Sequence, residues 1–449
     1  MGGGLLQLVA YGAQDAYITG NPHITFWKVL YKRHTNFAVE AFRVNFTGAP
    51  IYGQRVVAVI NRNADLIWKT YVEITLPATG LVQWTQAAAR RLGYQMLQQI
   101  EVEIGGQIID RHYGEWLYLW ETLTAEYDTA NKLDSMINNA TAGNSTSATS
   151  CNGRPTVLYV PLQFWFNRNP GLALPLIALQ YHEVRFNITL GAATDLVETN
   201  VGVEGGYSTL SAAAAALPQL KDMALYIDYV YLDVDERRRF AQESHEYLID
   251  QVQFEGQQQI TTSSARLDLT LNHPVKELIW VFQDARKTEC DPASLTALGA
   301  TNTQPFSYND IVDRCRIQIN GQDRFDERYG DYFWKVQPYQ HHSGGGFSRA
   351  IVDGSSASQA EPVVSRSAPN PINVYSFAIQ PEEHQPSGTC NFSRIDSATL
   401  VFNSVTNLTD GSDTGTFPTK AFPYNFRMYA VNYNILRIMS GMGGLAYSN

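Results

Sequence analysis

Acidic and basic side chains gather between Ile319 and Trp334, in the stretch INGQDRFDERYGDYFW. Asp326 and Asp331 stand there among arginines and tyrosines. Two carboxyl groups whose pKa values are separated by their surroundings can act as general acid and general base, as they do in glycoside hydrolases. On residue types alone, the stretch is a candidate hydrolytic site.

The same pattern occurs earlier in the chain, in EVEIGGQIIDRHYGEWLYLW from Glu101 to Trp120. There Asp110 and Glu115 hold the places of Asp326 and Asp331. A duplication kept for architecture retains structural residues in both copies, whereas an active site within one chain normally specialises one copy. We therefore interpret these carboxylates as structural, and we predict no catalytic residue and no enzymatic activity.

Each copy begins with a strand pattern. In the first copy, Ile100, Val102 and Ile104 alternate with Glu101 and Glu103, which predicts one buried and one solvated strand face. The apolar positions of the second copy are Cys315, Ile317 and Ile319.

A two-residue turn follows each strand, Gly105-Gly106 in the first copy and Asn320-Gly321 in the second. These residue types supply the positive φ angles of a type I′ hairpin. Flanking motifs keep the same order, because LIW precedes each copy and a Tyr-rich strand ends each half. The chain is thus predicted to be a tandem duplication of a unit of roughly 200 residues.

Strand signals dominate both halves, because short segments rich in β-branched and aromatic residues are bounded by Pro, Gly, Asn or Asp. The clearest helix pattern is LYLWETLTAEYDTANKLDSMINN from Leu117, and DVDERRRFAQESHEY suggests a short helical turn. We predict an all-β fold of two tandem eight-stranded jelly rolls, with short helices and long surface loops. The expected domains are an N-terminal arm (1–25), a first jelly roll (26–236) and a second jelly roll (237–449).

The formal net charge of -10 excludes an overall positive field that would attract a phosphate backbone, so we expect no direct nucleic-acid binding. Arg237, Arg238 and Arg239 lie among acidic residues, as in a solvated, salt-bridged connector. The longest apolar stretch, from Leu210, is too short to span a bilayer, so we expect no membrane-spanning segment.

Neither the cysteines nor the histidines show the spacing of a metal site. The four cysteines are far apart and form no Cys-x-x-Cys pair. His341 and His342 are adjacent in a Gly-rich segment without an acidic or Cys partner at ligand spacing, which predicts a solvated loop. His182 is expected to be a hydrogen-bonded histidine at a strand. We predict no metal ion and no cofactor.

Several longer motifs together resemble the major capsid proteins of nucleocytoplasmic large DNA viruses, in particular those of phycodnaviruses. The motifs are YGAQDAYITGNPHITFWKVLYKRHTNFA from Tyr11, IGGQIIDRHYGEWL from Ile104, LQYHEVRFNI from Leu179, YLDVDERRRFAQESHEYLI from Tyr231, FSRIDSATL from Phe392 and GMGGLAYSN from Gly441. They occur in order along the whole chain, which is far more specific than a single pattern.

The resemblance implies a double jelly-roll chain that forms a homotrimer, whose six rolls make a pseudo-hexagonal capsomer tiling an icosahedral shell. It implies a late viral protein of the virion capsid shell, assembled in the host cell cytoplasm. Its partners would be neighbouring capsomers and minor capsid and penton proteins, with the N-terminal arm pointing inward. The alternative, a tandem β-sandwich glycan-binding protein or glycoside hydrolase, is motivated by the 12% aromatic residues and the acidic clusters.

Two polar segments, Asn138 to Pro155 and His341 to Pro362, are rich in Ser, Thr and Gly and are expected to be long exposed loops. By the resemblance they would lie on the outer surface of the shell. Asn139 and Asn144, each in an Asn-x-Ser/Thr triplet, are the candidate glycan attachment positions in the first loop.

Overall fold

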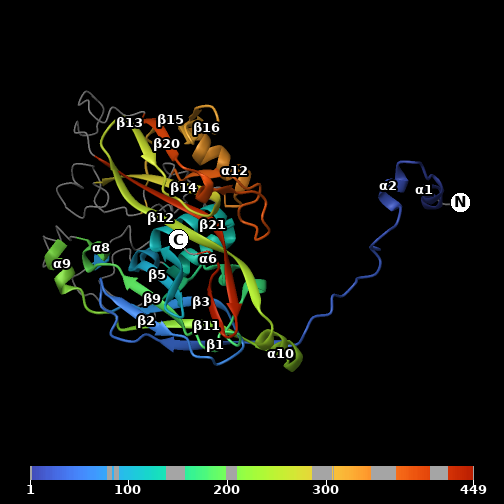
Figure 1. Ribbon diagram of the computed structural model, residues 1–449, viewed down its shortest axis with the longest axis horizontal. Coiled ribbons are helices and arrows are strands. Elements are labelled where there is room, and N and C mark those ends of the chain that lie inside the picture. The colour runs from blue at the N-terminus through green and yellow to red at the C-terminus, as the bar shows by residue number, and fades with distance from the viewer. Residues whose placement is uncertain are drawn as a thin grey trace, which may run out of the picture. The chain divides into compact units, whose positions relative to one another are not determined.

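The computed structural model describes residues 3–77, 83–84, 91–137, 157–198, 210–285, 306, 308–344, 371–404 and 423–447. The chain divides into two compact units, Met1–Phe37 and Ala38–Asn449. The first unit, called the arm below, contains two short helices, α1 (Gly3–Val9) and α2 (Asp15–Thr19), and otherwise little regular structure (Figure 1).

The first half of the second unit is a pair of antiparallel sheets with strand orders β1-β11-β3-β7 and β2-β9-β5-β6. Its strands are β1 (Phe37–Asn45), β2 (Arg55–Val59), β3 (Leu66–Thr75), β5 (Leu97–Ile104), β6 (Gln107–Tyr113), β7 (Val157–Pro161), β9 (Val184–Leu190) and β11 (Asp222–Leu232). The sheets pair strands distant in sequence, which is the jelly-roll arrangement.

The second half repeats that arrangement strand by strand, in the orders β12-β21-β14-β18 and β13-β20-β15-β16. Its strands are β12 (His245–Ile260), β13 (Ser264–Asp268), β14 (Pro274–Asp284), β15 (Val312–Ile319), β16 (Gln322–Asp323), β18 (Asn373–Ser376), β20 (Ala398–Ser404) and β21 (Tyr424–Met439). The prediction of two tandem jelly rolls is therefore confirmed.

Shorter elements join or extend these strands. The helices are α4 (Leu92–Met96), α5 (Gly114–Thr124), α6 (Tyr127–Ile137), α7 (Trp165–Arg168), η1 (Pro170–Leu172), α8 (Ala193–Leu196), α9 (Leu210–Ala216), α10 (Val234–Gln242), η3 (Tyr332–Val336), α12 (Gln337–His341) and η4 (Phe392–Arg394). The short strands are β4 (Gln83–Trp84), β8 (Leu174–Pro175), β10 (Val197–Glu198), β17 (Arg328–Tyr329), β19 (Cys390–Asn391) and β22 (Met442–Leu445). Within the described residues, no helix is both long enough and apolar enough to cross a membrane.

Both predicted hairpin turns have the expected backbone. The φ angles are 58° at Gly105, 86° at Gly106, 50° at Asn320 and 78° at Gly321. Positive φ at both central residues matches the right-handed twist of the flanking strands, so the Asn-Gly and Gly-Gly signals were correctly interpreted.

The predicted solvated face of the first hairpin strand is wrong at Glu101. Ile100, Val102 and Ile104 are buried as expected, but Glu101 is also only 4% exposed. Its carboxylate is held by Arg111 on the neighbouring strand and by Arg55. A charged side chain is tolerated in this position because these cations offset the loss of hydration.

The single long helix expected from Leu117 is two helices. α5 ends at Thr124, and α6 begins at Tyr127. The last carbonyl groups of α5 accept hydrogen bonds from the second roll, with Gly344 N donating to Leu123 O and Ser343 Oγ to Thr124 O. These bonds satisfy the helix end, so the chain turns there instead of continuing the helix.

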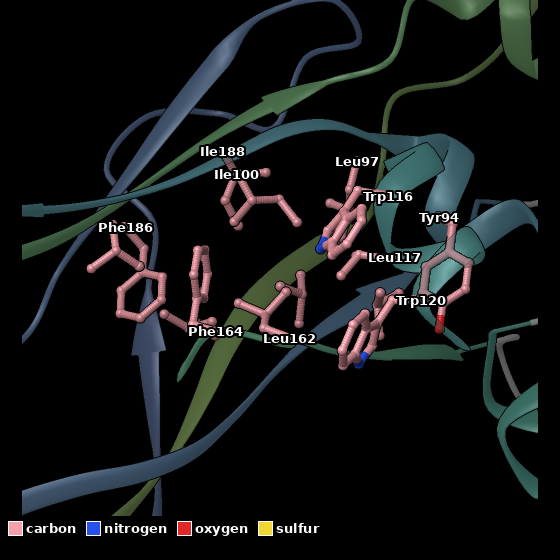
Figure 2. Close-up of a cluster of buried hydrophobic side chains, with 14 of the residues drawn as sticks. Tyr94, Leu97, Ile100, Trp116, Leu117, Trp120, Leu162, Phe164, Phe186 and Ile188 are labelled. Atoms are coloured by element: carbon pink, nitrogen blue, oxygen red, sulfur yellow. The ribbon is translucent and has the colours of Figure 1, made fainter. Parts of the chain in front are cut away.

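The core of the first roll lies between its sheets and under α5. Figure 2 shows Trp116 and Trp120 of α5 in the same apolar cluster as Phe164, Phe186 and Ile188. That cluster also contains outer-face residues of the second roll's sheet, among them Ile279, Val281, Tyr429 and Val431. The inner faces of the second roll form a separate cluster that includes Trp280 and Phe282. The sheet containing β14 is thus buried on both faces, because the first roll covers its outer side.

Candidate functional site

The structure brings the two copies of the Tyr-Gly motif to equivalent corners, one on each roll. We call Asp110–Trp116 the first corner and Asp326–Tyr332 the second corner. The region where the first corner and α5 meet the second roll is called the seam.

A glycine is required in both corners. A Cβ atom on Gly114 would lie 2.0 Å from Tyr94 O and 2.6 Å from Leu97 O, and one on Gly330 would lie 2.2 Å from Val312 O. These neighbours are backbone atoms that cannot move without displacing a strand or helix. The shared glycines therefore mark a close backbone approach repeated in each roll.

At the seam, Glu115 of the first corner binds residues of the second roll. Its carboxylate accepts hydrogen bonds from Arg427 Nη2 at 2.7 Å, Tyr429 Oη at 2.7 Å and Tyr308 Oη at 3.1 Å. Burial alone would lower the pKa of Arg427, but Glu115 outweighs it and raises that pKa. Burial and then Glu115 raise the pKa of Tyr429 far above its usual value. Both groups therefore stay protonated, and both donate to Glu115.

Aromatic rings surround this ion pair. Tyr113 lies with its ring centroid 4.9 Å from that of Phe254, and Phe254 stacks on Tyr429 at 4.7 Å. Trp116 approaches the other side of Tyr429 at 5.7 Å. Such contacts add to the energy of area burial, and they leave the side chains of Arg427 and Glu115 only 11% and 14% exposed.

Asp110 also contacts the second roll. One carboxylate oxygen accepts the backbone N–H of Val252 at 3.1 Å, while the other lies 2.9 Å from Nε2 of buried His112. Next to this contact, the side-chain amide of Gln251 donates to Ile109 O. The first corner therefore both positions its own roll and joins it to β12.

The histidine pair expected in a solvated loop behaves otherwise. His342 is buried, and its ring lies between Glu277, 3.1 Å from Nε2, and Glu382, 3.0 Å from Nδ1. Burial alone would lower the pKa of His342, but the two carboxylates raise it to about 9. The solvated-loop prediction was wrong for His342, because its acidic partners are distant in sequence and only the fold brings them near. Its neighbour His341 contacts the carbonyl oxygen of Ile379.

A further ion cluster lies nearby. Asp250 on β12 accepts from Lys276 Nζ at 3.0 Å and lies 3.3 Å from Arg168 of the first roll. The ammonium group of Lys276 also sits 5.2 Å from the ring centroid of Tyr433, a cation–π distance. Because the lysine side chain is fully buried, this pairing is needed to offset the loss of its hydration.

The C-terminal segment joins three of the sequence motifs. Gly443 N donates to Nδ1 of His182 at 3.2 Å, and the ring of Tyr181 packs beside Gly441. The same His182 ring lies under Gly105, where a Cβ atom would be 2.4 Å from Nδ1. His182 is thus a hydrogen-bonded histidine, as expected, and its partner is the tail of the second roll.

Among the residues that the structure describes, the second corner has no such partners in the first roll. Asp326 and Asp331 are exposed, and Asp331 pairs with Lys335, 2.6 Å away, and lies beside Asp310. Tyr329 is 61% exposed, although its counterpart Tyr113 is packed at the seam. The hairpin and the glycine keep their roles in both copies, whereas the carboxylates do not.

Other predicted positions are distributed as follows. Arg237, which lies on α10 in the predicted connector, forms a salt bridge of 2.8 Å with Asp65. Asn139 and Asn144 lie outside the described residues, as do Cys151 and Cys290. In the part of the chain that the structure describes, no group of three or more His, Cys, Asp or Glu side chains is arranged to hold a metal ion.

The fold and the seam together define a tandem double jelly-roll protein. Residues 25–233 match the family described as "Major capsid protein N-terminus", and residues 236–346 and 358–444 match "Large eukaryotic DNA virus major capsid protein". The chain therefore belongs to the major capsid proteins of large eukaryotic DNA viruses.

Curated relatives match over their whole length. The chain is 47% identical to the major capsid protein of Pyramimonas orientalis virus and 41% identical to that of Paramecium bursaria Chlorella virus 1, in each case over 100% of both chains. A quasi-atomic structure of the PBCV-1 virus capsid matches with a TM-score of 0.74 and 35% identity, over 95% of this chain and 100% of that one. These relatives are structural proteins rather than enzymes, so the hydrolase and glycan-binding alternatives have no support.

Proposed function

We propose that this capsid protein acts as a homotrimer whose six rolls form a pseudo-hexagonal capsomer, and that such capsomers tile an icosahedral shell. The observation that supports this most directly is the repeated strand order of the two rolls. Each chain contributes two similar lobes joined by a large buried seam. Three such chains have an approximately six-sided outline, which packs into a closed shell more readily than a three-lobed one.

The arm supports a role in contacts beyond the capsomer. Its large apolar side chains are exposed, and they include Leu5, Leu6, Leu8, Val9, Tyr11, Tyr17, Ile18, Ile24, Phe26, Trp27, Val29, Leu30 and Tyr31. A segment of this composition gains stability by covering its apolar surface against a partner. We assign that role to minor capsid and penton proteins on the inner side of the shell.

The remaining expectations belong to the same proposal. For the domains we keep the sequence-based bounds, with 1–25 as the N-terminal segment, 26–236 as the first roll and 237–449 as the second, so residues 26–37 of the first compact unit are counted with the first roll. Capsomers would contact one another laterally, and assembly would take place in the host cell cytoplasm late in infection. Asn139 and Asn144 remain the candidate glycan positions on an outer loop.

Light scattering coupled to size-exclusion chromatography tests the central claim. The purified chain is expected at about three times its 50.2 kDa mass, with hexagonal outlines in negative-stain images. A monomer that persists at high protein concentration, with no hexagonal particles, would contradict the proposal.

A further inference from the structure

The seam has two halves, a corner of the first roll and the outer face of a sheet of the second roll. An equivalent of each half occurs elsewhere on the chain, where it has no partner among the described residues. One half is a corner, which is packed at Asp110–Trp116 and is exposed at Asp326–Tyr332 except for buried Gly330 and half-buried Tyr332. The other half is the outer face of a sheet. The first roll covers this face on the strands β12-β21-β14-β18, whereas the equivalent strands β1-β11-β3-β7 have an open outer face.

The burial patterns of equivalent strands show this difference. In β14, ten consecutive residues from Val275 to Asp284 are buried, because one face meets its own roll and the other meets the first roll. In β3, buried positions such as Val72 and Ile74 alternate with half-buried Tyr71 and Glu73. The inner face of β3 is therefore packed while its outer face remains accessible to solvent.

The open outer face carries tyrosines in a row. Tyr71 and Tyr226 are opposite each other on β3 and β11, with stacked rings 5.1 Å apart, and Tyr159 of β7 lies 6.1 Å from Tyr71. Glu73 follows Tyr71 by two residues on β3, and Asp228 follows Tyr226 by two residues on β11, so both acidic groups lie on the same face as the tyrosines. Burial, then Tyr226, Glu73 and Asp228, raise the pKa of Tyr71. We call these five residues the acceptor face.

The second corner also carries charged and aromatic side chains. Tyr329 projects from it, and its hydroxyl accepts a hydrogen bond from Arg314 Nη2 at 2.9 Å. The guanidinium group of Arg328 is exposed and lies 5.1 Å from the ring centroid of Tyr332. The corner thus offers Arg314 and Arg328 beside aromatic rings, next to the exposed carboxylates of Asp326, Glu327 and Asp331. The acceptor face offers Glu73 and Asp228 beside aromatic rings, with Lys69 next to Asp228.

The seam shows what such surfaces do when they meet. There the corner residues Tyr113 and Trp116 pack against Phe254 and Tyr429, and an ion pair forms inside the aromatic contact. In the seam the carboxylate, Glu115, is on the corner and its arginine is on the sheet. The second corner and the acceptor face with its neighbour Lys69 each carry both signs of charge, so a contact between them offers Arg328 to Glu73 and Asp228, and Lys69 to the carboxylates of the corner. Opposite charges within an aromatic contact provide both affinity and register.

We propose that the second corner, through Arg328 and Tyr329, binds the acceptor face of another copy of this chain, around Tyr71, Tyr159 and Tyr226. This inference rests on the proposed trimer and names its contact. The contact is heterologous, since different surfaces of the two copies meet, and a heterologous contact closes into a ring when its rotation allows. The seam and this contact then alternate around the six rolls.

A photo-cross-linking residue tests the contact without destabilising the fold. p-Benzoylphenylalanine in place of Tyr329 is expected to cross-link to peptides of β3, β7 or β11. Assembling the variant with isotope-labelled wild-type chain shows whether each cross-link joins different copies. The matched control carries the same residue in place of Tyr339, which is 84% exposed on α12, and should not label those strands.

Substitutions give a second readout. Arg328→Glu with Tyr329→Asp in one variant, and Tyr71→Asp with Tyr226→Asp in another, should each turn the trimer into a monomer, whereas Tyr339→Asp should leave it trimeric. The first variant keeps its acceptor face and the second keeps its second corner. An equimolar mixture of the two is therefore expected to form a one-to-one dimer through the one intact contact. Circular dichroism and thermal unfolding check that each monomer is folded.

The outcomes separate this inference from the proposed function. A wild-type trimer that cross-links from position 329 to other surfaces, or that survives both pairs of substitutions, overturns the contact and leaves the trimer intact. A wild-type chain that is never trimeric overturns the proposed function itself. The contact is supported if cross-links between copies join position 329 to the acceptor face and both double-substitution variants are monomers.

Discussion

His342 makes the stability of the second roll depend on pH. Its pKa is 6.5 in an ordinary setting and about 9 between Glu277 and Glu382. A folded-state pKa above the unfolded one favours the folded chain fully below pH 6.5, and this contribution disappears as the pH rises through about 9. At roughly 1.4 kcal/mol for each pH unit between those values, the contribution is about 3 kcal/mol.

The corresponding perturbation is His342→Gln. A neutral amide leaves buried Glu277 and half-buried Glu382 without the positive charge between them, so the variant should be less stable than wild type at pH 7 by about 3 kcal/mol. Wild type should lose about 2 to 3 kcal/mol between pH 7 and pH 10, whereas the variant should show little of that decline. The control is His341→Gln, which keeps the buried ion cluster and should follow the wild-type pH dependence.

Urea unfolding at a series of pH values and at fixed protein concentration measures this difference. The decisive quantity is the difference in unfolding free energy between wild type and His342→Gln, because tyrosines and lysines that titrate at high pH contribute equally to both chains. This difference should decrease from about 3 kcal/mol at pH 7 toward zero near pH 10. Parallel stability curves for the two chains over this range would refute the assignment of a charged His342.

Three further predictions concern the seam and the corners. Glu115→Gln should destabilise the chain by about 3 kcal/mol or more, because Arg427 would stay buried without its carboxylate, whereas Asp331→Asn at the exposed equivalent position should change thermal stability by less than about 1 kcal/mol. Equal effects of the two substitutions would contradict the difference between the corners. Gly330→Ala should cost about 2 kcal/mol or more in unfolding free energy, since its Cβ would lie 2.2 Å from a backbone oxygen. Truncation after Ser440 should lower the melting temperature and increase proteolysis at the seam, and an unchanged digestion pattern would show that the tail does not join the rolls.

Much of the fold was predictable from local sequence patterns. The strand pattern of Ile100, Val102 and Ile104 lies in β5, and the hairpin at Asn320-Gly321 has the expected backbone. Alternation and turn chemistry act between neighbouring residues, so a single sequence displays them directly. The duplication was also visible, because both copies keep the glycines that each corner requires.

Other elements had too little local signal. The long strand β12 was not predicted, since HEYLIDQVQFEGQQQI has no regular alternation and its first residues were assigned to a helical turn. It forms because β21 pairs with it along almost its whole length, and the first corner packs on its outer side. Likewise, the helix expected from Leu117 is interrupted where Ser343 and Gly344 bind its end.

The sequence by itself determined the tandem repeat, the two hairpins, the glycine corners and the family. The tertiary structure alone decided which copy of each shared residue is buried, so Glu115 lies in an ion pair while Asp331 faces solvent. It also placed His342 between two glutamates that are distant from it along the chain. The physical reason is that backbone turns depend on adjacent residues, whereas the burial and charge state of a side chain depend on segments that only folding brings together.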